Sequence, residues 1–401
     1  MHINTDMLKD KIKELAKNYA PEYIKVRQHL HAHPELSYQE FETSAFVQQE
    51  LKKYDIPFKI MATTGVVGII EGQDPSSRIV ALRADMDALP IMEENDIPYR
   101  STKPGIMHAC GHDVHTTCLL GAARILSETK KEWKGTVKLV FQPGEEKNPG
   151  GASLLIKEGV LKDPAPSAIA ALHVNPQLEV GKLSFRSGKV MASADEIYIT
   201  IKGKGGHAAA PHFTTDIILV ASQLIVSLQQ VISRNRDPFA PSVLSITSFQ
   251  AGNTTNVIPS EVKLMGTFRA MDEEWRFRAH DIIKKHATEL VHSMGAEIDV
   301  NIDVGYPTVY NNEQLHEMAS AIAVEFMPEG KVEETEMRMG AEDFGFYSQQ
   351  IPGCFFRLGT ANKKLGITAG VHTPRFNIDE NAIETGMGIM ATMGAFLALN
   401  R

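Results

Sequence analysis

Cysteine is scarce in this sequence, which excludes the small secreted proteins that depend on disulfide bonds. Cys110, Cys118 and Cys354 are the only cysteines among 401 residues. A small, odd number of cysteines in a long chain does not form a disulfide framework. We therefore expect free thiols, and Cys110 in particular is available for chemistry.

Long apolar runs and clusters of positive charge are also missing. No apolar run approaches the roughly 20 residues that span a bilayer, and residues 1–20 are charged and amphipathic rather than like a signal peptide. The net charge is −8 and no Lys/Arg cluster occurs, whereas phosphate binding needs concentrated positive charge. We expect a cytoplasmic protein that binds neither membranes nor nucleic acid.

Repeats, low-complexity tracts and Gly/Ser linkers are absent, so the domain boundaries have to come from the residue pattern. A chain of 401 residues exceeds what one hydrophobic core usually holds, which favours two domains. Hydrophobic residues make up 43% and charged residues 22% of the chain. This balance is typical of a soluble globular protein.

Apolar strands alternate with amphipathic helices over the first half of the chain. After an opening helix, the 3.6-residue pattern predicts helices at residues 22–36 and 39–54. Short runs rich in Val and Ile then alternate with helical patterns, and they predict strands at 66–72, 78–85, 135–143 and 167–174. This alternation is typical of a largely parallel sheet that is buried on both faces.

Residues 186–302 follow a different pattern. Their strand and helix signals come in the order β-α-β-β-α-β, which is typical of a ferredoxin-like unit. From about Val304 the chain returns to the style of the first half. We predict an α/β fold in which residues 1–185 and 303–401 form a mainly parallel-sheet domain, with an α+β domain inserted at 186–302.

Ionisable side chains follow the ends of several predicted strands. In parallel sheets, functional groups gather in the crevice beyond the carboxyl ends of the strands. Cys110 and His112 lie in a loop just before a helix, and the residues at strand ends are Asp85, Asp87, Glu145, Glu146 and His173. We expect all of these groups at one edge of one sheet.

Cys110 and His112 have the spacing of two metal ligands. Thiolate, imidazole and carboxylate groups hold zinc and its neighbours in the transition series. Residues two positions apart in an extended loop can face the same side. A histidine in a loop is more often only a hydrogen-bonding residue, so this pair alone would not identify a metal site.

The adjacent Glu145 and Glu146 strengthen the metal interpretation. Two buried carboxylates side by side are unfavourable unless a cation compensates one charge or a proton stays on the other. One glutamate could then bind the metal, while the other takes a proton from a water and returns it to a leaving amine. This division predicts hydrolysis of an amide bond.

The motifs that carry this chemistry resemble those of a known family. They are "LRADMDALPI", "MHACGHDVHTT", "FQPGEE", "LHV", "GKGGHAAAPH", "NTTNVIP", "GTFR", "GAEDF" and "HTPRFNIDE", in this order. Together they are similar to the di-metal amidohydrolases of metallopeptidase family 20, subfamily D, a group of N-acyl-amino-acid amidohydrolases (aminoacylases) that includes hippurate hydrolase and auxin-conjugate hydrolases. The resemblance implies two divalent metal ions per subunit (Zn, Mn, Co or Ni) and an inserted lid domain that dimerises.

The resemblance also assigns roles to individual residues. Glu145 matches the general base, and Asp87 matches an aspartate that orients the site from behind the ligands. The five matched metal ligands divide into His112 and His173 on one metal and Glu146 and His372 on the other, with Cys110 close to both. Asp85 stands where the wider family has a ligand histidine, so we do not expect it to bind metal.

Three residues of the inserted domain match functional positions of the family. His207 corresponds to a histidine that reaches the active site of the partner subunit and stabilises an oxyanion. Asn256 and Arg269 correspond to residues that hold the free carboxylate of the substrate, for which arginine offers a fork of donors. Simpler roles stay open, since Asn256 could cap a turn before Pro259 and Arg269 could be a surface charge.

Three functions stay open on the sequence alone. The leading one is hydrolysis of N-acyl-L-amino acids, and a dipeptidase or carboxypeptidase with the same metal centre is the alternative. A non-catalytic binding protein is disfavoured because the five ligand positions and the base are all intact. The expected partners are a small N-acyl amino acid or peptide and further copies of the chain, in a homodimer or higher homo-oligomer. The other histidines of these motifs are expected on helix surfaces or behind the ligands: His29, His31, His33, His108 and His115.

Overall fold

The computed structural model describes residues 4–399, which divide into two compact units. Unit 1 contains the residues up to Val190, Tyr310–Glu336 and those from Asp343 on, and unit 2 contains Met191–Val309 and Met337–Glu342. The sequence pattern placed the inserted segment at 186–302. It did not assign residues 337–342 to that segment, because so short a stretch has no periodic pattern of its own.

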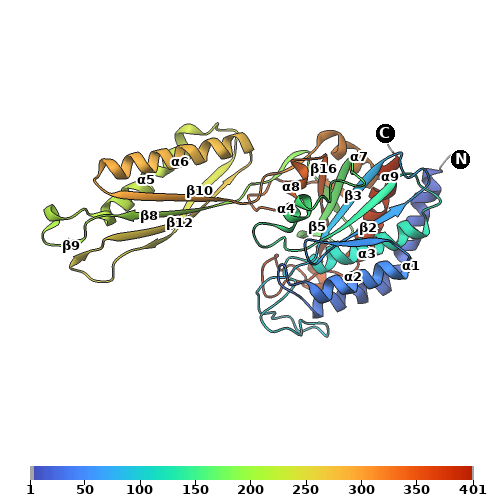
Figure 1. The fold of residues 1–401 in the computed structure, drawn as a ribbon. Coiled ribbons are helices and arrows are strands. Elements are labelled where there is room, and N and C mark those ends of the chain that lie inside the picture. Colours follow the sequence, from blue (N-terminus) through green and yellow to red (C-terminus); the bar gives the residue numbers. More distant parts are fainter. Residues whose placement is uncertain (1–3, 400–401) are drawn as a thin grey trace. The chain divides into compact units, whose positions relative to one another are not determined.

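Unit 1 is organised around an eight-stranded sheet (Figure 1). In spatial order its strands are β1 (Phe58–Met61), β2 (Gly65–Glu71), β4 (Thr136–Gln142), β3 (Ile79–Asp85), β5 (Ala168–Glu179), β16 (Gly353–Ala361), β6 (Leu183–Phe185) and β15 (Val332–Glu334). The central strands β4, β3, β5 and β16 are parallel to their neighbours within this group. β4 and β16 are buried along their whole length, as expected for strands covered on both faces. The predicted mainly parallel α/β sheet is confirmed.

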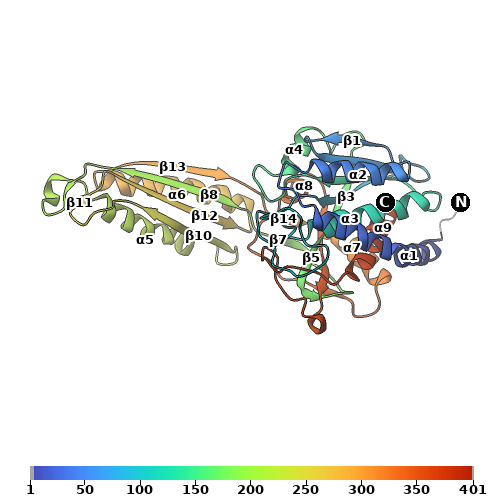
Figure 2. The same ribbon diagram turned by 90° about the horizontal axis from the view of Figure 1, so that it is seen from below.

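The helices of unit 1 pack around this sheet (Figure 2). They are α1 (Thr5–Ala32), α2 (Phe41–Lys53), α3 (His112–Glu128), α4 (Gly151–Lys157), α7 (Glu313–Phe326), α8 (Gly345–Ser348) and α9 (Ala382–Leu399), with the 3₁₀ turn η2 (Lys363–Leu365). α3 and α9 contact each other and the central strands, and α1 packs on α3 and α9. One hydrophobic core therefore extends from α1 through α3 and α9 to the sheet.

α1 is a single helix, where the sequence pattern predicted two. Pro21 lies inside it, although proline removes a helical hydrogen bond and usually ends or kinks a helix. Ile12 and Ala16 before Pro21, and Tyr23 and Arg27 after it, are all buried, and their spacing places them on one helical face. Packing of this face against α3 and α9 holds both halves in one helix.

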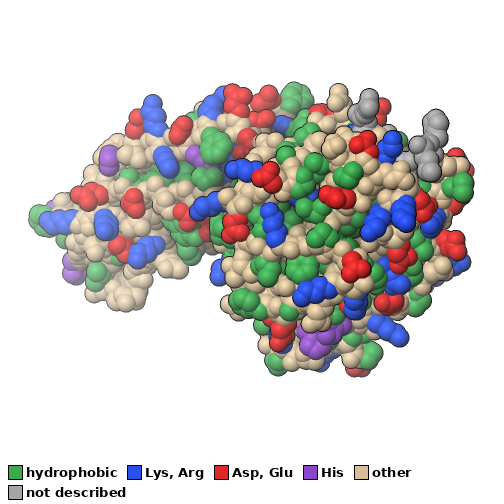
Figure 3. Space-filling model, turned by 45° about the vertical axis from the view of Figure 1, so that its right-hand side comes forward, with side chains coloured by type: hydrophobic (Ala, Val, Ile, Leu, Met, Phe, Trp, Pro, Cys, Tyr) green, Lys and Arg blue, Asp and Glu red, His purple; other side chains and the backbone are tan. Residues whose placement is uncertain are grey.

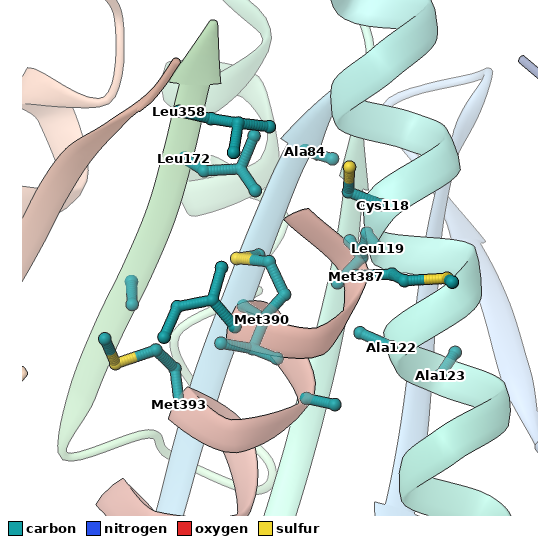
Figure 4. Close-up of a cluster of buried hydrophobic side chains, with 14 of the residues drawn as sticks. Ala84, Cys118, Leu119, Ala122, Ala123, Leu172, Leu358, Met387, Met390 and Met393 are labelled. Atoms are coloured by element: carbon teal, nitrogen blue, oxygen red, sulfur yellow. The ribbon is translucent and has the colours of Figure 1, made fainter. Parts of the chain in front are cut away.

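Glycines allow α3 and α9 to approach each other closely. A Cβ atom at Gly386 would lie 2.3 Å from Sγ of Cys118, and one at Gly121 would lie 2.7 Å from Cβ of Met387. Figure 4 shows the methionines of α9, Met390 among them, packed beside α3 and the strands. The flexible methionine side chains fill the irregular space that remains.

Unit 2 has a four-stranded antiparallel sheet with two helices on one face (Figure 1). Along the chain these elements are β8 (Asp195–Lys202), α5 (Ile217–Asn235), β10 (Ser242–Gln250), β12 (Glu261–Ala270), α6 (Glu273–Ser293) and β13 (Glu297–Val304). The sheet order is β10-β12-β8-β13, and the order along the chain is the predicted β-α-β-β-α-β of a ferredoxin-like unit. Shorter elements of unit 2 are β9 (Gly206–His207), which pairs with β11 (Val257–Ile258), and η1 (Pro211–Phe213). β7 (Gly188–Met191) pairs with β14 (Val309–Asn311), and most residues of these two strands belong to unit 1.

Two features of the structure bear on the expected partners. Contrary to the sequence expectation, α5 and α9 are long and apolar enough to cross a membrane by length and composition. The apolar window of α9 is 83% buried in the protein, as in a core helix, and that of α5 is 33% buried. Acidic and basic side chains are intermixed over the face drawn in Figure 3.

We predict that Gly386→Ala destabilises the protein, although alanine is the better helix former. Helix propensity alone would favour the variant by about 1 kcal/mol. The added methyl group would instead collide with Cys118, and overpacking of this kind costs about 1–3 kcal/mol. Urea unfolding should show a lower midpoint, and Cys118→Ala in the same chain should recover part of the loss. A raised midpoint for Gly386→Ala would contradict the close packing of α3 on α9.

Candidate metal centre

The register of the central strands brings the predicted site residues to one level of the sheet. β3 ends at Asp85, level with the end of β4, and Arg83 pairs with Ala171 of β5 on the other side. His173 therefore lies beside the end of β3. The sequence predicted His173 at the end of a strand. In the structure β5 continues past His173 to Glu179, because His173 and the residues after it pair with β16.

Gly111 forms the turn between the Cys110 loop and α3. Its φ is +84°, a left-handed conformation that glycine adopts readily. A Cβ atom there would lie 2.6 Å from Cγ2 of Val174. The sequence suggested an extended loop, but His112 is the first residue of α3, and it is this turn that brings Cys110 and His112 to the same place.

The five predicted metal ligands form two groups that share one sulfur atom. Within each group the donor atoms lie within 4.8 Å of one another. The groups are Cys110, His112 and His173, and Cys110, Glu146 and His372. The structure thus brings together all five residues, in the same two sets that the family resemblance implied, and their role as ligands stays a prediction.

Asp87 orients two of these residues. Its Oδ1 lies 3.1 Å from Nδ1 of His112, and its Oδ2 accepts a hydrogen bond from the backbone N–H of Glu146 at 2.9 Å. Burial would raise the pKa of Asp87, but the hydrogen bonds from His112 and Ser37 lower it. Because Nδ1 of His112 donates to a carboxylate, its Nε2 is the nitrogen left for a metal.

The backbone orients His173 and His372. Nδ1 of His173 donates to the next backbone carbonyl at 2.8 Å, and its Nε2 lies 3.5 Å from Sγ of Cys110. His372 has a φ of +61°, a conformation that is uncommon outside glycine and occurs at functional sites. Its N–H donates to the carbonyl of Ala109 at 2.8 Å, and its Nε2 lies 3.1 Å from Oε1 of Glu146. A residue from the far end of the chain is thereby tied to the Cys110 loop.

Asp85 supports the site from behind. Nη1 of Arg83 and Nδ1 of His115 each lie 2.6 Å from its carboxylate. Oδ2 of Asp85 is 3.7 Å from Nε2 of His112. Burial would raise the pKa of Asp85, but Arg83 and the two histidines hold it well below its usual range. Asp85 is therefore a buried counter-charge close to Nε2 of His112.

The donor atoms fit a pair of divalent transition-metal ions. Among the residues that the structure describes, Nε2 of His112 is buried without a hydrogen-bond partner, which is unfavourable unless the atom binds something else. Burial, with the nearby Glu146 and Glu145, raises the pKa of the Cys110 thiol well above its usual range. A divalent cation would displace that proton and hold the thiolate.

Glu145 lies beside the ligands and is itself buried. Its Oε2 is 4.0 Å from Nε2 of His112, and its carboxylate forms a further set of close donor atoms with His112 and Glu146. Gly144 before it has a φ of +56°, and this sharp turn lets two consecutive glutamates approach one centre. The placement suits a proton carrier next to the ligands.

The segment between α1 and α2 also supports the site, which the sequence reasoning missed. Ser37 donates to Oδ2 of Asp87 at 2.6 Å. Glu40 is buried, and its Oε1 accepts a hydrogen bond from the N–H of Gly144 at 2.8 Å. These two side chains hold Asp87 and the loop of Glu145. The polar residues in "PELSYQE" were the only signal, and their partners lie far along the chain.

The remaining histidines of the motifs differ in exposure. His31, His108 and His115 are buried, His29 is exposed and His33 is partly buried. His115 lies behind the ligands through its contact with Asp85. Of the two places expected for His31, its burial excludes the helix surface, because the face of α1 that carries it is packed into unit 1, and its contact with Asp113 agrees with a place behind the ligands.

The candidate residues of unit 2 lie at two separate places. His207 pairs with Val257 of β11, directly after Asn256, near the end of the sheet where β12 begins at Glu261. Arg269 lies near the other end of β12, a strand of 10 residues. At about 3.4 Å per residue, Arg269 is roughly 25–30 Å from the end that carries Asn256. Asn256 and Arg269 of one chain are therefore too far apart to contact one small substrate together, and their role in binding a carboxylate stays a prediction.

Comparisons with known proteins agree with this geometry. The sequence profile of peptidase family M20/M25/M40 matches residues 81–394. An IAA-amino acid hydrolase of Arabidopsis thaliana is 41% identical, over 92% of this chain and 84% of its own, and an N-acyl-L-amino acid amidohydrolase of Geobacillus stearothermophilus is 41% identical, over 77% and 83%. A thermostable carboxypeptidase of Saccharolobus solfataricus is 37% identical, over 94% and 96%. The crystal structure of the YXEP protein of Bacillus subtilis, a dinuclear metal binding peptidase, superposes with a TM-score of 0.83 at 34% identity, over 95% and 99%.

We predict that metal affinity rises steeply with pH. Burial would lower the pKa of His112, but Asp85 and Asp87 raise it to about 10, and the thiol of Cys110 also titrates well above its usual value. Both groups therefore carry a proton at neutral pH when no metal is bound, and binding has to release both.

Release of two protons increases the apparent affinity by up to about 100-fold per pH unit between roughly pH 6 and 8. Competition with a chelator measures the affinity, and calorimetry in two buffers counts the protons. Cys110→Ala should release one proton fewer. An affinity that does not change with pH would exclude the thiol and the imidazole as ligands.

Proposed function

This chain belongs to peptidase family M20/M25/M40, and we propose that the centre around Cys110 is its active site, with Glu145 as the proton carrier. The protein is a metal-dependent amidohydrolase that cleaves N-acyl-L-amino acids to a carboxylic acid and a free amino acid. The main support for the site is the pair of ligand groups that share Cys110, with the buried carboxylate of Glu145 beside them.

The reaction needs one residue that first accepts a proton and later donates it. Two divalent cations held by the five ligands would polarise the amide carbonyl and raise the acidity of a water molecule. Glu145 accepts a proton from that water while the water oxygen attacks the carbonyl carbon. It then donates the proton to the amide nitrogen as the C–N bond breaks, which frees the amine of the amino acid. Asp87 keeps His112 and Glu146 oriented throughout.

His207 is the proposed donor to the oxyanion that forms on the carbonyl oxygen. The N–H of Ala209 donates to Nδ1 of His207 at 3.1 Å, so the neutral ring carries its own proton on Nε2. The side chain is exposed. An exposed N–H donor on a short strand suits a contact with substrate that arrives from outside unit 2.

We propose a homodimer in which each copy supplies His207 and Asn256 to the other copy's site. This is supported by the length of β12, since one small substrate cannot touch Arg269 and Asn256 of the same chain. Within the described residues, β10 is an open edge of the unit 2 sheet, and Leu219 and Val226 of α5 are exposed. Pairing between copies would cover the open edge and these apolar side chains.

The metal and the location are also proposals. A donor set of one cysteine, three histidines and one glutamate accepts Zn, Mn, Co or Ni, so availability decides among them. A cytoplasmic location is supported by the three cysteines, all of which are free thiols.

A carboxypeptidase or dipeptidase is the second candidate, favoured by the similarity to a carboxypeptidase. A peptide bond is also an amide next to a free carboxylate, so the same residues would serve. The two are separated by a hydrolysis screen of N-acetyl, N-benzoyl and N-indoleacetyl amino acids beside dipeptides. The protein is first stripped with a chelator, and each metal is added back. Turnover that is indifferent to the chelator would contradict the proposed centre.

We predict that Glu145→Gln abolishes turnover but keeps the metal. The amide side chain is nearly isosteric and cannot accept the proton, so kcat should fall by about 10²–10⁴-fold. Metal content by mass spectrometry should stay close to two ions per subunit. Glu146→Gln is the matched control. Because Glu146 is a proposed ligand, this variant should lose metal and activity together. Equal loss of metal from Glu145→Gln would make Glu145 a ligand instead.

We predict that two inactive variants complement each other. A His207→Ala chain mixed with a Glu145→Gln chain forms heterodimers with one intact composite site. With random exchange, half of the dimers are mixed and each has one working site of two, so activity should recover to about a quarter of wild type. Light scattering and tagged subunits verify the exchange. Proven exchange without recovery would show that His207 does not act in the partner.

A further inference from the structure

We propose that Arg27 and His31 of α1 are positioning residues that hold two ligand-bearing segments of the metal centre, 110–113 and 372–377, in fixed relation to each other. The matched family profile begins at residue 81, so both residues lie outside it. The inference rests on the proposed metal centre. It concerns how the ligands are held, not which residues they are.

Arg27 bridges the two segments directly. Its Nε donates to Oδ2 of Asp113 at 2.8 Å, and its Nη2 donates to Oδ1 of Asn377 at 3.2 Å. Asp113 directly follows the ligand His112 in the first turn of α3, and Asn377 lies in the loop that begins with the ligand His372. The guanidinium is fully buried. One rigid fork therefore spans both segments from within α1.

His31 adds a second connection between the same segments. Its Nδ1 lies 2.8 Å from Oδ2 of Asp113, and its Nε2 lies 3.1 Å from Oε1 of Glu93. The same oxygen of Glu93 accepts a hydrogen bond from Asn95 at 3.0 Å, and Asn95 also donates to the carbonyl of Phe376 at 2.9 Å. His31 thus reaches the segment after His372 through Glu93 and Asn95.

The chemistry of these groups makes the connection stiff. Two basic side chains face two buried carboxylates, Asp113 and Glu93, and removing either partner of a buried pair leaves a charge without compensation. Hydrogen bonds between charged groups are shorter and stronger than neutral ones. A lysine in place of Arg27 would keep the charge, but it lacks the planar fork that contacts Asp113 and Asn377 together.

Two further contacts hold the segment 372–377 without α1. The N–H of His372 donates to the carbonyl of Ala109, and Glu94 accepts from Arg375 at 3.0 Å. These contacts are a backbone hydrogen bond and an ion pair of exposed side chains, which contributes little on its own. Arg27 and His31 provide the buried side-chain contacts, so metal geometry should depend on them.

The test uses Co²⁺ binding to the full-length protein stripped of metal. Co²⁺ reports affinity by titration, and its visible bands and thiolate charge-transfer band report the geometry around Cys110. Arg27→Lys breaks the bridge while keeping the charge. His31→Gln keeps a donor near Glu93 but loses the contact with Asp113, whereas His31→Asn keeps a donor near Asp113. Ile12→Ala is the control, because Ile12 is buried in the same helix and is part of the hydrophobic core.

Loss of support behind metal ligands typically weakens binding by about 10- to 100-fold, and we expect this for Arg27→Lys and His31→Gln, with an altered Co²⁺ spectrum. His31→Asn should also weaken binding, because it keeps a donor near Asp113 but loses the contact with Glu93 that continues the connection to Phe376. Ile12→Ala should lower the melting temperature without changing the spectrum or the affinity measured well below it.

Three results would overturn the proposal, and they differ in meaning. If the wild-type protein binds no Co²⁺, the metal centre itself is wrong and the positioning role fails with it. If the wild type binds but Arg27→Lys and His31→Gln bind equally tightly with an unchanged spectrum, only the positioning role is wrong. If Arg27→Lys and His31→Gln lose no more Co²⁺ affinity than Ile12→Ala when the three variants are equally destabilised, Arg27 and His31 only stabilise the fold.

Discussion

The interaction on which the rest of the structure depends is the compensation of negative charge at the carboxyl end of the parallel sheet. Asp85, Asp87 and Glu145 are buried there and Glu146 is only partly exposed. Carboxylates this close repel one another in a medium that solvates charge poorly. Arg83 and the imidazoles neutralise the two aspartates. The glutamates and the Cys110 sulfur are left for cations, and this defines the site chemically.

The ligands come from segments far apart in the chain, so their geometry depends on what surrounds them. Gly111 turns Cys110 and His112 to one place, Asp87 holds His112 and Glu146, and the loop after α1 holds Asp87 and Gly144. α1 completes this support through Arg27. A helix whose sequence pattern is that of an ordinary amphipathic helix therefore contacts Asp113, next to the ligand His112, and Asn377, in the loop after the ligand His372.

The candidate residues of unit 2 do not gather at one place, unlike those of unit 1. Its sheet is exposed on one face, and its candidate residues sit at opposite ends of β12. That distance is a simple product of strand length and rise per residue. Asn256 and Arg269, which the family resemblance assigns to one carboxylate, are therefore too far apart to bind one small substrate within a single chain. The dimer proposal follows from this separation as much as from the open edge of the sheet.

The sequence by itself determined the elements and the chemistry. Strand and helix periodicity predicted the parallel sheet and the β-α-β-β-α-β unit, because burial imposes a period of two or 3.6 on local residues, and donor types at strand ends predicted a metal centre. Only the tertiary structure decided that α1 continues through Pro21, that His173 lies within β5, that His31 is buried and that Asn256 is far from Arg269. Each of these depends on contacts or distances between residues remote in the chain, which leave no local pattern.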